Sequence, residues 1–174
     1  MRRTRFDASR MPRWAIRRAT CEEAASAVRI LRDVAALLVE KGSPLWDPQD
    51  FELDDFRNAA SRGELVLGYQ GAEPVACMLL QRSDPVFWPD DSPGEALYLH
   101  KLAVLSEARG LGWSSRLIAW AQARAVESAV HFLRLDAPQS RLISLYQKHG
   151  FVLIDREPRW FGKTKAVRLE MPIP

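Results

Sequence analysis

The sequence has few of the residues and patterns that specialised protein classes require. Only two cysteines occur among 174 residues, Cys21 and Cys77, and neither belongs to a Cys-x-x-Cys pair. Their scarcity argues against a disulfide framework and a cysteine-based zinc site, and it predicts a reducing, cytoplasmic location. No apolar run approaches the roughly 20 residues that a membrane-spanning helix needs, so we expect no membrane partner. Internal repeats and low-complexity blocks are absent as well.

What the chain does have is the composition of an ordinary globular domain. Apolar residues make up 47% and charged residues 27% of the sequence, and the formal net charge is +3. The basic residues are unevenly placed, because seven arginines lie in residues 1–18 and the remainder is mildly acidic. We therefore expect a basic N-terminal arm over residues 1–13 and one domain over residues 14–174. Such an arm can contact nucleic acid or an acidic partner, although short terminal arms are more often simply solvated. The acidic remainder argues against nucleic acid as the main partner.

Periodic apolar residues predict alternating strands and helices. Thr20 and Glu23 have the spacing of a capping box and predict the start of a helix that continues to about Glu40. Apolar residues at helical spacing predict three more helices, at about 49–61, 113–125 and 140–149. Apolar alternation predicts strands at 14–20, 64–69, 74–82, 95–104, 131–137, 151–155 and 166–171. This order predicts one α/β domain with a central mixed, mostly antiparallel sheet of six to seven strands flanked by four helices.

A glycine-rich turn stands between the strand at 95–104 and the helix that follows it. It reads Arg109-Gly-Leu-Gly112, and Ser114 and Ser115 fall in the first helical turn. Backbone N–H groups at a helix N-terminus attract anions, and glycines allow a phosphate to come close. The pattern is neither a Walker A loop nor a complete Gly-x-Gly-x-x-Gly fingerprint. Taken alone, the two glycines serve equally well as a phosphate cradle or as a simple turn.

Three motifs in order resemble the GNAT superfamily of N-acetyltransferases. Residues 109–114, Arg-Gly-Leu-Gly-Trp-Ser, are similar to its Arg/Gln-x-x-Gly-x-Gly/Ala signature, whose turn binds the pyrophosphate of acetyl-CoA. The preceding LHKLAV resembles the fourth strand of the family, and SLYQKHGF at 144–151 resembles its second conserved block. Two positions depart from the pattern, Ser114 for a glycine or alanine and Gln139 for a frequent asparagine. The resemblance implies a sheet splayed between its fourth and fifth strands.

The resemblance also implies where acetyl-CoA binds. The pantetheine arm is expected in the splay, where it pairs with backbone groups of 102–104, and the pyrophosphate is expected on the amides of 109–114. The implied cofactor-binding residues are Leu102, Ala103, Val104, Arg109, Gly110, Leu111, Gly112, Trp113, Ser114, Gln139 and Tyr146.

Acetyl transfer to an amine requires a neutral amine and a protonated leaving thiol. Tyr146 matches the family tyrosine that donates to the departing sulfur, although an aromatic at this place also suits a core. His100 is a candidate general base because its usual pKa fits the task, although a lone histidine on a strand is more often structural. Glu95, acting through water, and Asp136 are alternatives for the base. No metal site is predicted.

The acceptor pocket is expected between loops that are rich in tryptophan. Trp46, Trp88 and Trp160 are the candidate substrate-binding residues, since aromatic rings with nearby acids suit a cationic amine; packing of these loops onto the core is the alternative. The expected function is acetyl transfer from acetyl-CoA to a primary amine of a small molecule or peptide, by direct attack in a ternary complex. The alternative is a catalytically inactive acyl-CoA-binding sensor or interaction module. A homodimer is a further possibility, because many relatives pair through their C-terminal strands.

Overall fold

The computed structural model describes residues 14–174, so the basic arm predicted over residues 1–13 lies outside the described part. The strands are β1 (Trp14–Arg18), β2 (Leu65–Gln70), β3 (Glu73–Gln81), β4 (Ala96–Val104), β5 (Phe132–Ala137), β6 (Val152–Leu153), β7 (Arg159–Phe161) and β8 (Thr164–Pro172). The α-helices are α1 (Ala24–Glu40), α2 (Leu53–Ser61), α3 (Trp113–Glu127) and α4 (Ser140–Lys148). Short 3₁₀ turns are η2 (Cys21–Glu23), η3 (Pro48–Asp50) and η4 (Ser106–Ala108).

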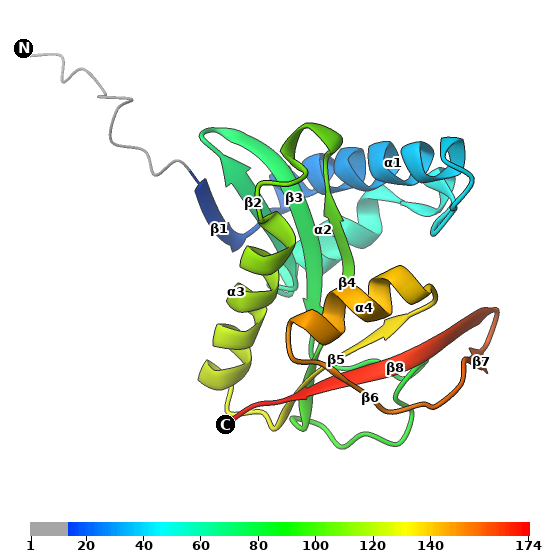
Figure 1. Cartoon of the computed structure of the whole chain (residues 1–174). Coiled ribbons are helices and arrows are strands. Elements are labelled where there is room, and N and C mark those ends of the chain that lie inside the picture. Colours follow the sequence, from blue (N-terminus) through cyan, green and yellow to red (C-terminus); the bar gives the residue numbers. More distant parts are fainter. Residues whose placement is uncertain (1–13) are drawn as a thin grey trace, which may run out of the picture.

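The strands form one open sheet in the order β1-β2-β3-β4-β5-β8-β6, and β7 pairs with β8 beside this path (Figure 1). Only the β4–β5 pair is parallel among the described strands. The predicted mixed, mostly antiparallel sheet with four helices is therefore confirmed. The structure adds β7 within a segment expected to be a loop, and it shortens the strand expected at 151–155 to two residues. Within residues 14–174, no helix has both the length and the apolar character needed to cross a membrane.

The starts of the first two helices show how local sequence sets local structure. The capping box between Thr20 and Glu23 is present, but it closes the turn η2 before α1 begins. Asp47 accepts a hydrogen bond from Gln49 N and caps η3, which also contains Pro48. Phe51 then has an extended backbone, so α2 begins at Leu53 and not at 49 as predicted.

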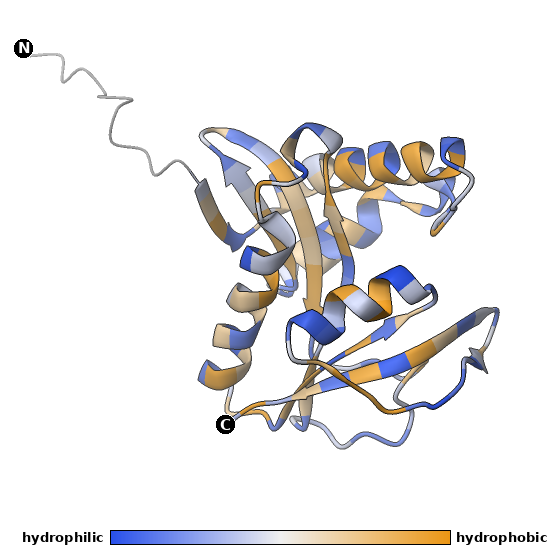
Figure 2. Ribbon diagram, viewed as in Figure 1, coloured by the Kyte–Doolittle hydropathy of each residue, from blue (hydrophilic) through white to orange (hydrophobic). Residues whose placement is uncertain are grey.

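Helices cover both faces of the sheet, and each pair of helices encloses its own hydrophobic core. Along β2, Leu65 and Leu67 join the core beneath α1 and α2, whereas Val66 joins the core beneath α3 and α4. This alternation follows from the two-residue period of a strand. The helices show the matching pattern, with hydrophobic and hydrophilic patches alternating along α1 in Figure 2.

β4 and β5 separate partway along their length. They pair over three positions, from Ala96 with Phe132 to Tyr98 with Arg134, although both strands continue further. Figure 1 shows the two strands diverging, with α4 lying beside the opening. The splay implied by the resemblance is therefore present, and it leaves one edge of β4 beyond Tyr98 without a partner strand in the described part of the chain.

Candidate functional site

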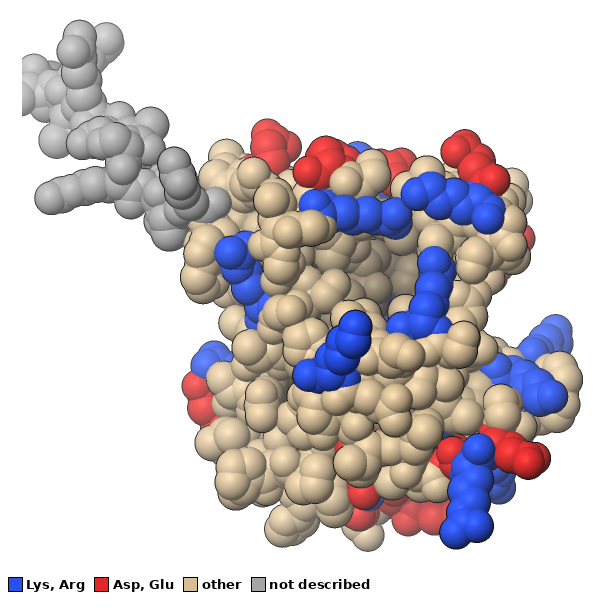
Figure 3. Space-filling model, in the orientation of Figure 1, with Lys and Arg blue, Asp and Glu red and all other residues tan. Residues whose placement is uncertain are grey.

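A cavity of about 350 Å³ lies where β4 and β5 part. It is bounded by β4, the loop after β3, the loop after α1, the end of β5 and α4. Figure 3 shows this face of the molecule hollowed between the part that carries α1 and the part that carries α4, with Lys and Arg side chains around the hollow. The polar and aromatic residues that line it are Trp46, Gln81, Asp84, Phe87, His100, Lys101, Asp136, Tyr146 and Thr164.

A local irregularity in β4 turns several neighbouring side chains toward the cavity. Lys101 has a positive φ of 53°, a backbone conformation that residues other than glycine rarely adopt. The pairing of β3 with β4 shifts register at the same place, between Cys77 and Leu79. A regular strand would direct His100 and Lys101 to opposite faces, but here both line the cavity. The strained backbone thus changes the direction of β4 side chains at the site.

Two carboxylates hold the His100 ring from its two nitrogen atoms. Nε2 lies 3.2 Å from Asp84 Oδ2, and Nδ1 lies 3.4 Å from Asp136 Oδ1. Burial alone would lower the pKa of His100, but hydrogen bonding and charge from Asp136 and Asp84 outweigh it and raise the pKa to about 9. His100 is therefore an imidazolium at neutral pH. The three residues also offer ligand atoms within 4.8 Å of one another, yet carboxylates on opposite ring nitrogens suit an imidazolium better than a shared metal ion.

Asp84 is held in place by its own loop. Its Oδ1 accepts hydrogen bonds from the backbone N–H groups of Val86 and Phe87, which closes the chain into a tight turn directly after β3. Burial alone would raise the pKa of Asp84. His100 and these two N–H groups together have a larger effect in the opposite direction, so the pKa lies below its usual value. The carboxylate is thus fixed as an anion facing His100.

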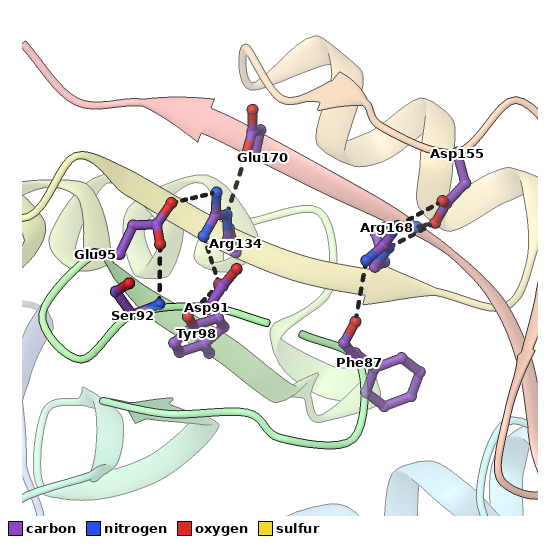
Figure 4. A network of polar contacts seen from close by, with 9 residues as sticks. All are labelled: Phe87, Asp91, Ser92, Glu95, Tyr98, Arg134, Asp155, Arg168 and Glu170. Carbon is purple, nitrogen blue, oxygen red and sulfur yellow. Dashed lines mark hydrogen bonds and ion pairs between the residues drawn. The ribbon is translucent and has the colours of Figure 1, made fainter. Parts of the chain in front are cut away.

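Two arginines on the neighbouring strands β5 and β8 bind this loop (Figure 4). Arg168 on β8 donates to the carbonyl of Phe87 and makes a two-pronged ion pair with Asp155. Arg134 on β5 contacts Asp91 and Glu95, and Glu170 accepts from its Nε. These contacts connect the loop at 82–95, which forms one wall of the cavity, to β5 and β8.

Tyr146 reaches the cavity from α4. It is a buried residue, and its ring packs edge-on against Phe151 with the centroids 5.6 Å apart. Burial, followed by the charge of Asp136, raises the pKa of the phenol well above its usual value. Tyr146 therefore remains a hydrogen-bond donor over the whole physiological pH range.

The glycine turn after β4 has the shape of an open cradle. Gly110 and Gly112 have φ values of 76° and 79°, and a Cβ atom at either position would meet nothing within 4 Å. Gly112 is the N-cap of α3, and the first helical backbone bond runs from Arg116 N to its carbonyl. The N–H groups of the first turn therefore point outward along the helix axis, where an anion is stabilised.

The other predicted cofactor residues lie in three settings. Leu102 lines the cavity, whereas Ala103 and Val104 pair with β3 through one backbone edge. Trp113 is only 2% exposed, so its side chain packs inside and only its backbone is available to a ligand. Gln139 donates its side-chain amide to the carbonyl of Pro44 at 3.0 Å, and it thereby joins the start of α4 to the loop after α1.

The predicted acceptor and base residues separate into two groups. Trp46 lines the cavity beside His100, and its ring lies edge-on to Phe51. Trp88 is buried on the far side of the loop, where Arg134 and Arg168 stack on its ring. Trp160 is 69% exposed on β7, and Glu95 is paired with Arg134. The structure does not bring Trp88, Trp160 or Glu95 to the cavity that holds His100 and Tyr146.

Sequence reasoning missed two charged residues of the site, Asp84 and Lys101. The Ser-Asp-Pro sequence indicates a turn at Asp84, but only the tertiary fold shows that its carboxylate faces His100. Lys101 follows His100 directly, so strand alternation would place it on the opposite face. A positive φ at a lysine leaves no pattern in the sequence that could have revealed it.

The chain is similar in sequence to known acetyltransferases. A family model described as the acetyltransferase (GNAT) family matches residues 31–151. The uncharacterized N-acetyltransferase YesJ of Bacillus subtilis (strain 168) is 29% identical over 146 residues, which are 76% of this chain and 78% of that protein.

Solved structures of two further proteins have a similar fold. An acetyltransferase of the GNAT family from Listeria monocytogenes 4b F2365 superposes with a TM-score of 0.74 at 23% identity, over 91% of this chain and 95% of that chain. YncA, a putative acetyltransferase from Salmonella typhimurium solved with its cofactor acetyl-CoA, gives a TM-score of 0.71 at 13% identity, over 94% of this chain and 95% of that chain.

Proposed function

The chain belongs to the acetyltransferase (GNAT) family, and from this premise we propose that it transfers the acetyl group of acetyl-CoA to a primary amine of a small molecule or peptide, by direct attack in a ternary complex. One observation carries the proposal. The parting of β4 and β5 opens a cavity that contains Tyr146 and His100 next to an unpaired strand edge, and β4 continues from there to the glycine turn.

The residues of the chain fit the parts of acetyl-CoA. The open space at Gly110 and Gly112 and the outward N–H groups of α3 suit a pyrophosphate, and Arg109 stands at the head of the same turn. The free edge of β4 over residues 102–104 suits the amides of an extended pantetheine arm, in the manner of an added strand. When bound, acetyl-CoA supplies a thioester whose acetyl carbon accepts the amine and whose sulfur leaves as a thiol.

His100 is the proposed acceptor of the proton that the amine must lose. With a pKa of about 9, its imidazole accepts a proton readily only when the pH approaches that value. Asp84 and Asp136 orient the ring and give this group a net negative charge while His100 is protonated. An incoming ammonium ion is therefore attracted to the place where it is to be deprotonated.

Tyr146 is the proposed donor to the departing sulfur. A free phenol already has a higher pKa than a thiol, whose usual value is about 8.5, and burial of Tyr146 widens this difference. Complete transfer of the phenol proton to a thiolate is therefore unfavourable. A hydrogen bond from the phenol nevertheless stabilises the charge that develops on sulfur. Over the whole reaction the neutral amine loses one proton and the thiol gains one, so the number of protons is conserved.

The proposal is tested by measuring thiol release from acetyl-CoA with a panel of primary amines. Amine-dependent release that yields an N-acetylated product is the expected result. Binding of acetyl-CoA without turnover on any amine would instead support the alternative of a catalytically inactive acyl-CoA-binding module.

Replacing Tyr146 by phenylalanine tests its role. We expect Tyr146→Phe to lower kcat about a hundredfold, because the hydrogen bond to sulfur is lost, while the affinity for acetyl-CoA measured by calorimetry changes little. Tyr69→Phe is the matched control, since its phenol binds Glu23 outside the cavity. An unchanged kcat in Tyr146→Phe would remove this tyrosine from the mechanism.

A further inference from the structure

Lys101 is the one Lys or Arg side chain among the residues that line the cavity. Burial lowers the pKa of its ammonium group, and the charges of Asp136 and Asp50 oppose that shift. Lys101 belongs to none of the salt bridges formed by the described residues, whereas His100 in the same cavity has two carboxylate partners. A partly desolvated cation without an ion pair is costly, so its presence calls for an explanation.

Aromatic rings hold the Lys101 ammonium group in position. Nζ lies 5.2 Å from the centroid of the Trp46 ring and 5.5 Å from that of Phe51. These cation–π contacts offset part of the lost hydration and fix the direction of a flexible side chain. They leave the positive charge available to an anion, because ring faces provide no carboxylate oxygen.

The backbone adds a second, independent observation. Lys101 has a positive φ and lies at the register shift of β4, and this geometry brings its side chain to the same cavity as His100. Strain of this kind persists where the surrounding structure imposes it, most often at functional sites. The same cavity therefore contains two charged groups of opposite sign. One is the net negative group of His100 with Asp84 and Asp136, and the other is the ammonium group of Lys101.

We propose that Lys101 is the anion-binding residue of the acceptor site, and that the acceptor is a small apolar amino acid whose carboxylate pairs with Lys101 while its amine faces His100. The apolar part of such an acceptor fits the other walls of the cavity, which include Leu45, Val86, Phe87 and Leu142. This inference rests on the proposed acetyl transfer and narrows its substrate class.

The test compares three acceptors that differ only in the acid group. Leucine carries the carboxylate, leucinamide replaces it by a neutral amide, and isoamylamine lacks it. We expect Lys101→Gln to lower kcat/KM for leucine at least about tenfold, mainly through KM, and to change the values for the other two acceptors less than about twofold. The ratio of variant to wild type is the decisive quantity, because the different amine pKa values of the acceptors cancel in it.

Controls separate a binding role from a structural one. Lys165→Gln removes an exposed lysine outside the cavity and should leave all three ratios near one. Lys101→Arg keeps the charge and should retain part of the preference for leucine. Equal losses on all three acceptors in Lys101→Gln would overturn the inference, as would a lack of acetyl transfer to leucine by the wild type.

The failure of this inference differs from the failure of the proposed function. If Lys101→Gln changes transfer to neither isoamylamine nor leucine, the protein is an acetyltransferase whose acceptor needs no anionic group, and only the inference about Lys101 fails. Absence of both acetyl-CoA binding and thiol release with every amine would contradict the proposed function itself.

Discussion

The ionisation of His100 decides at which pH the site can accept a proton from an amine. Its partners Asp84 and Asp136 come from the loop after β3 and from β5, so the fold brings together three residues that are distant in sequence. The pKa of about 9 means that the fraction of neutral imidazole increases as the pH rises through that value. The proposed base is therefore weakly populated at neutral pH and better populated under alkaline conditions.

Replacing one carboxylate should shift this titration. We expect Asp84→Asn to lower the pKa of His100 by about one unit or more, because one of two stabilising charges is lost. The rising limb of the pH profile of kcat/KM should then move to lower pH on the same amine. Since the amine titrates identically with both enzymes, a limb that stays at its wild-type position would exclude His100 as the titrating base.

Single residues of the site differ in how well the sequence reveals them. His100 and Tyr146 could be predicted because each lies within a motif that resembles a known family. Asp84 and Lys101 could not, since one depends on the tertiary position of a loop and the other on an irregular backbone torsion. The prediction that Trp88 and Trp160 bind substrate used their loop positions and the affinity of aromatic rings for cations, and neither of these distinguishes a cavity wall from a buried or an exposed ring.

At the scale of elements, α3 packs on the sheet along its buried face, and its first residue makes one especially close approach. The ring of Trp113, the first residue of α3, packs over Gly68 on β2, and a Cβ atom at Gly68 would lie 2.7 Å from Trp113 Cζ3. Glycine is required there because of this contact, since the backbone of Gly68 has no positive φ. The packing sets where the N-terminus of α3, and with it the glycine turn, stands relative to β4.

Adding a methyl group at this contact should destabilise the fold. We expect Gly68→Ala to lower the free energy of unfolding by about 1–3 kcal/mol, because the aromatic ring or the strand must move. Urea denaturation followed by circular dichroism measures the change. On a Trp113→Leu background the same substitution should cost less, because the ring atoms are gone; equal costs on both backgrounds would show that the ring is not the obstacle.

Elements with a strong periodic signal were predicted well, and those that depend on tertiary pairing were not. The four helices and the long strands follow apolar periods that are visible in the sequence. β7 has three residues and exists because it pairs with β8, so no period of its own could identify it. The start of α2 was displaced because Asp47 and Pro48 close a separate 3₁₀ turn.

At the scale of the whole molecule, ionised carboxylates contribute to stability in a way that depends on pH. Arg17, together with Thr20 N and the Tyr69 phenol, holds the pKa of Glu23 well below its usual value. Asp84 and Asp155 also have lowered pKa values in the folded state. A lowered folded-state pKa stabilises the fold above the unfolded-state pKa of about 4, and this contribution is lost as the pH falls further.

Glu23 offers a direct check of this pH dependence. We expect Glu23→Gln to be less stable than the wild type at pH 7 by at most about 1 kcal/mol, because Arg17 is half exposed and water screens the pair. The difference in Tm should narrow as the pH falls from 5 to 3, since the carboxyl of Glu23 then binds a proton in the unfolded chain and this favours unfolding of the wild type. A difference that stays constant over this range would mean that Glu23 acts through packing and not through its charge.

The short pairing between β4 and β5 also means that the two halves of the sheet are joined by few backbone contacts. Among the described residues, backbone pairing between β4 and β5 covers three positions at one end, and side-chain contacts such as His100–Asp136 and Gln139–Pro44 span the rest of the opening. Beyond the three paired positions β4 and β5 share no backbone pairing, so a molecule that lies there as an added strand would act as a crosslink as well as a reactant. We therefore expect the rigidity of the protein to depend on whether this opening is occupied.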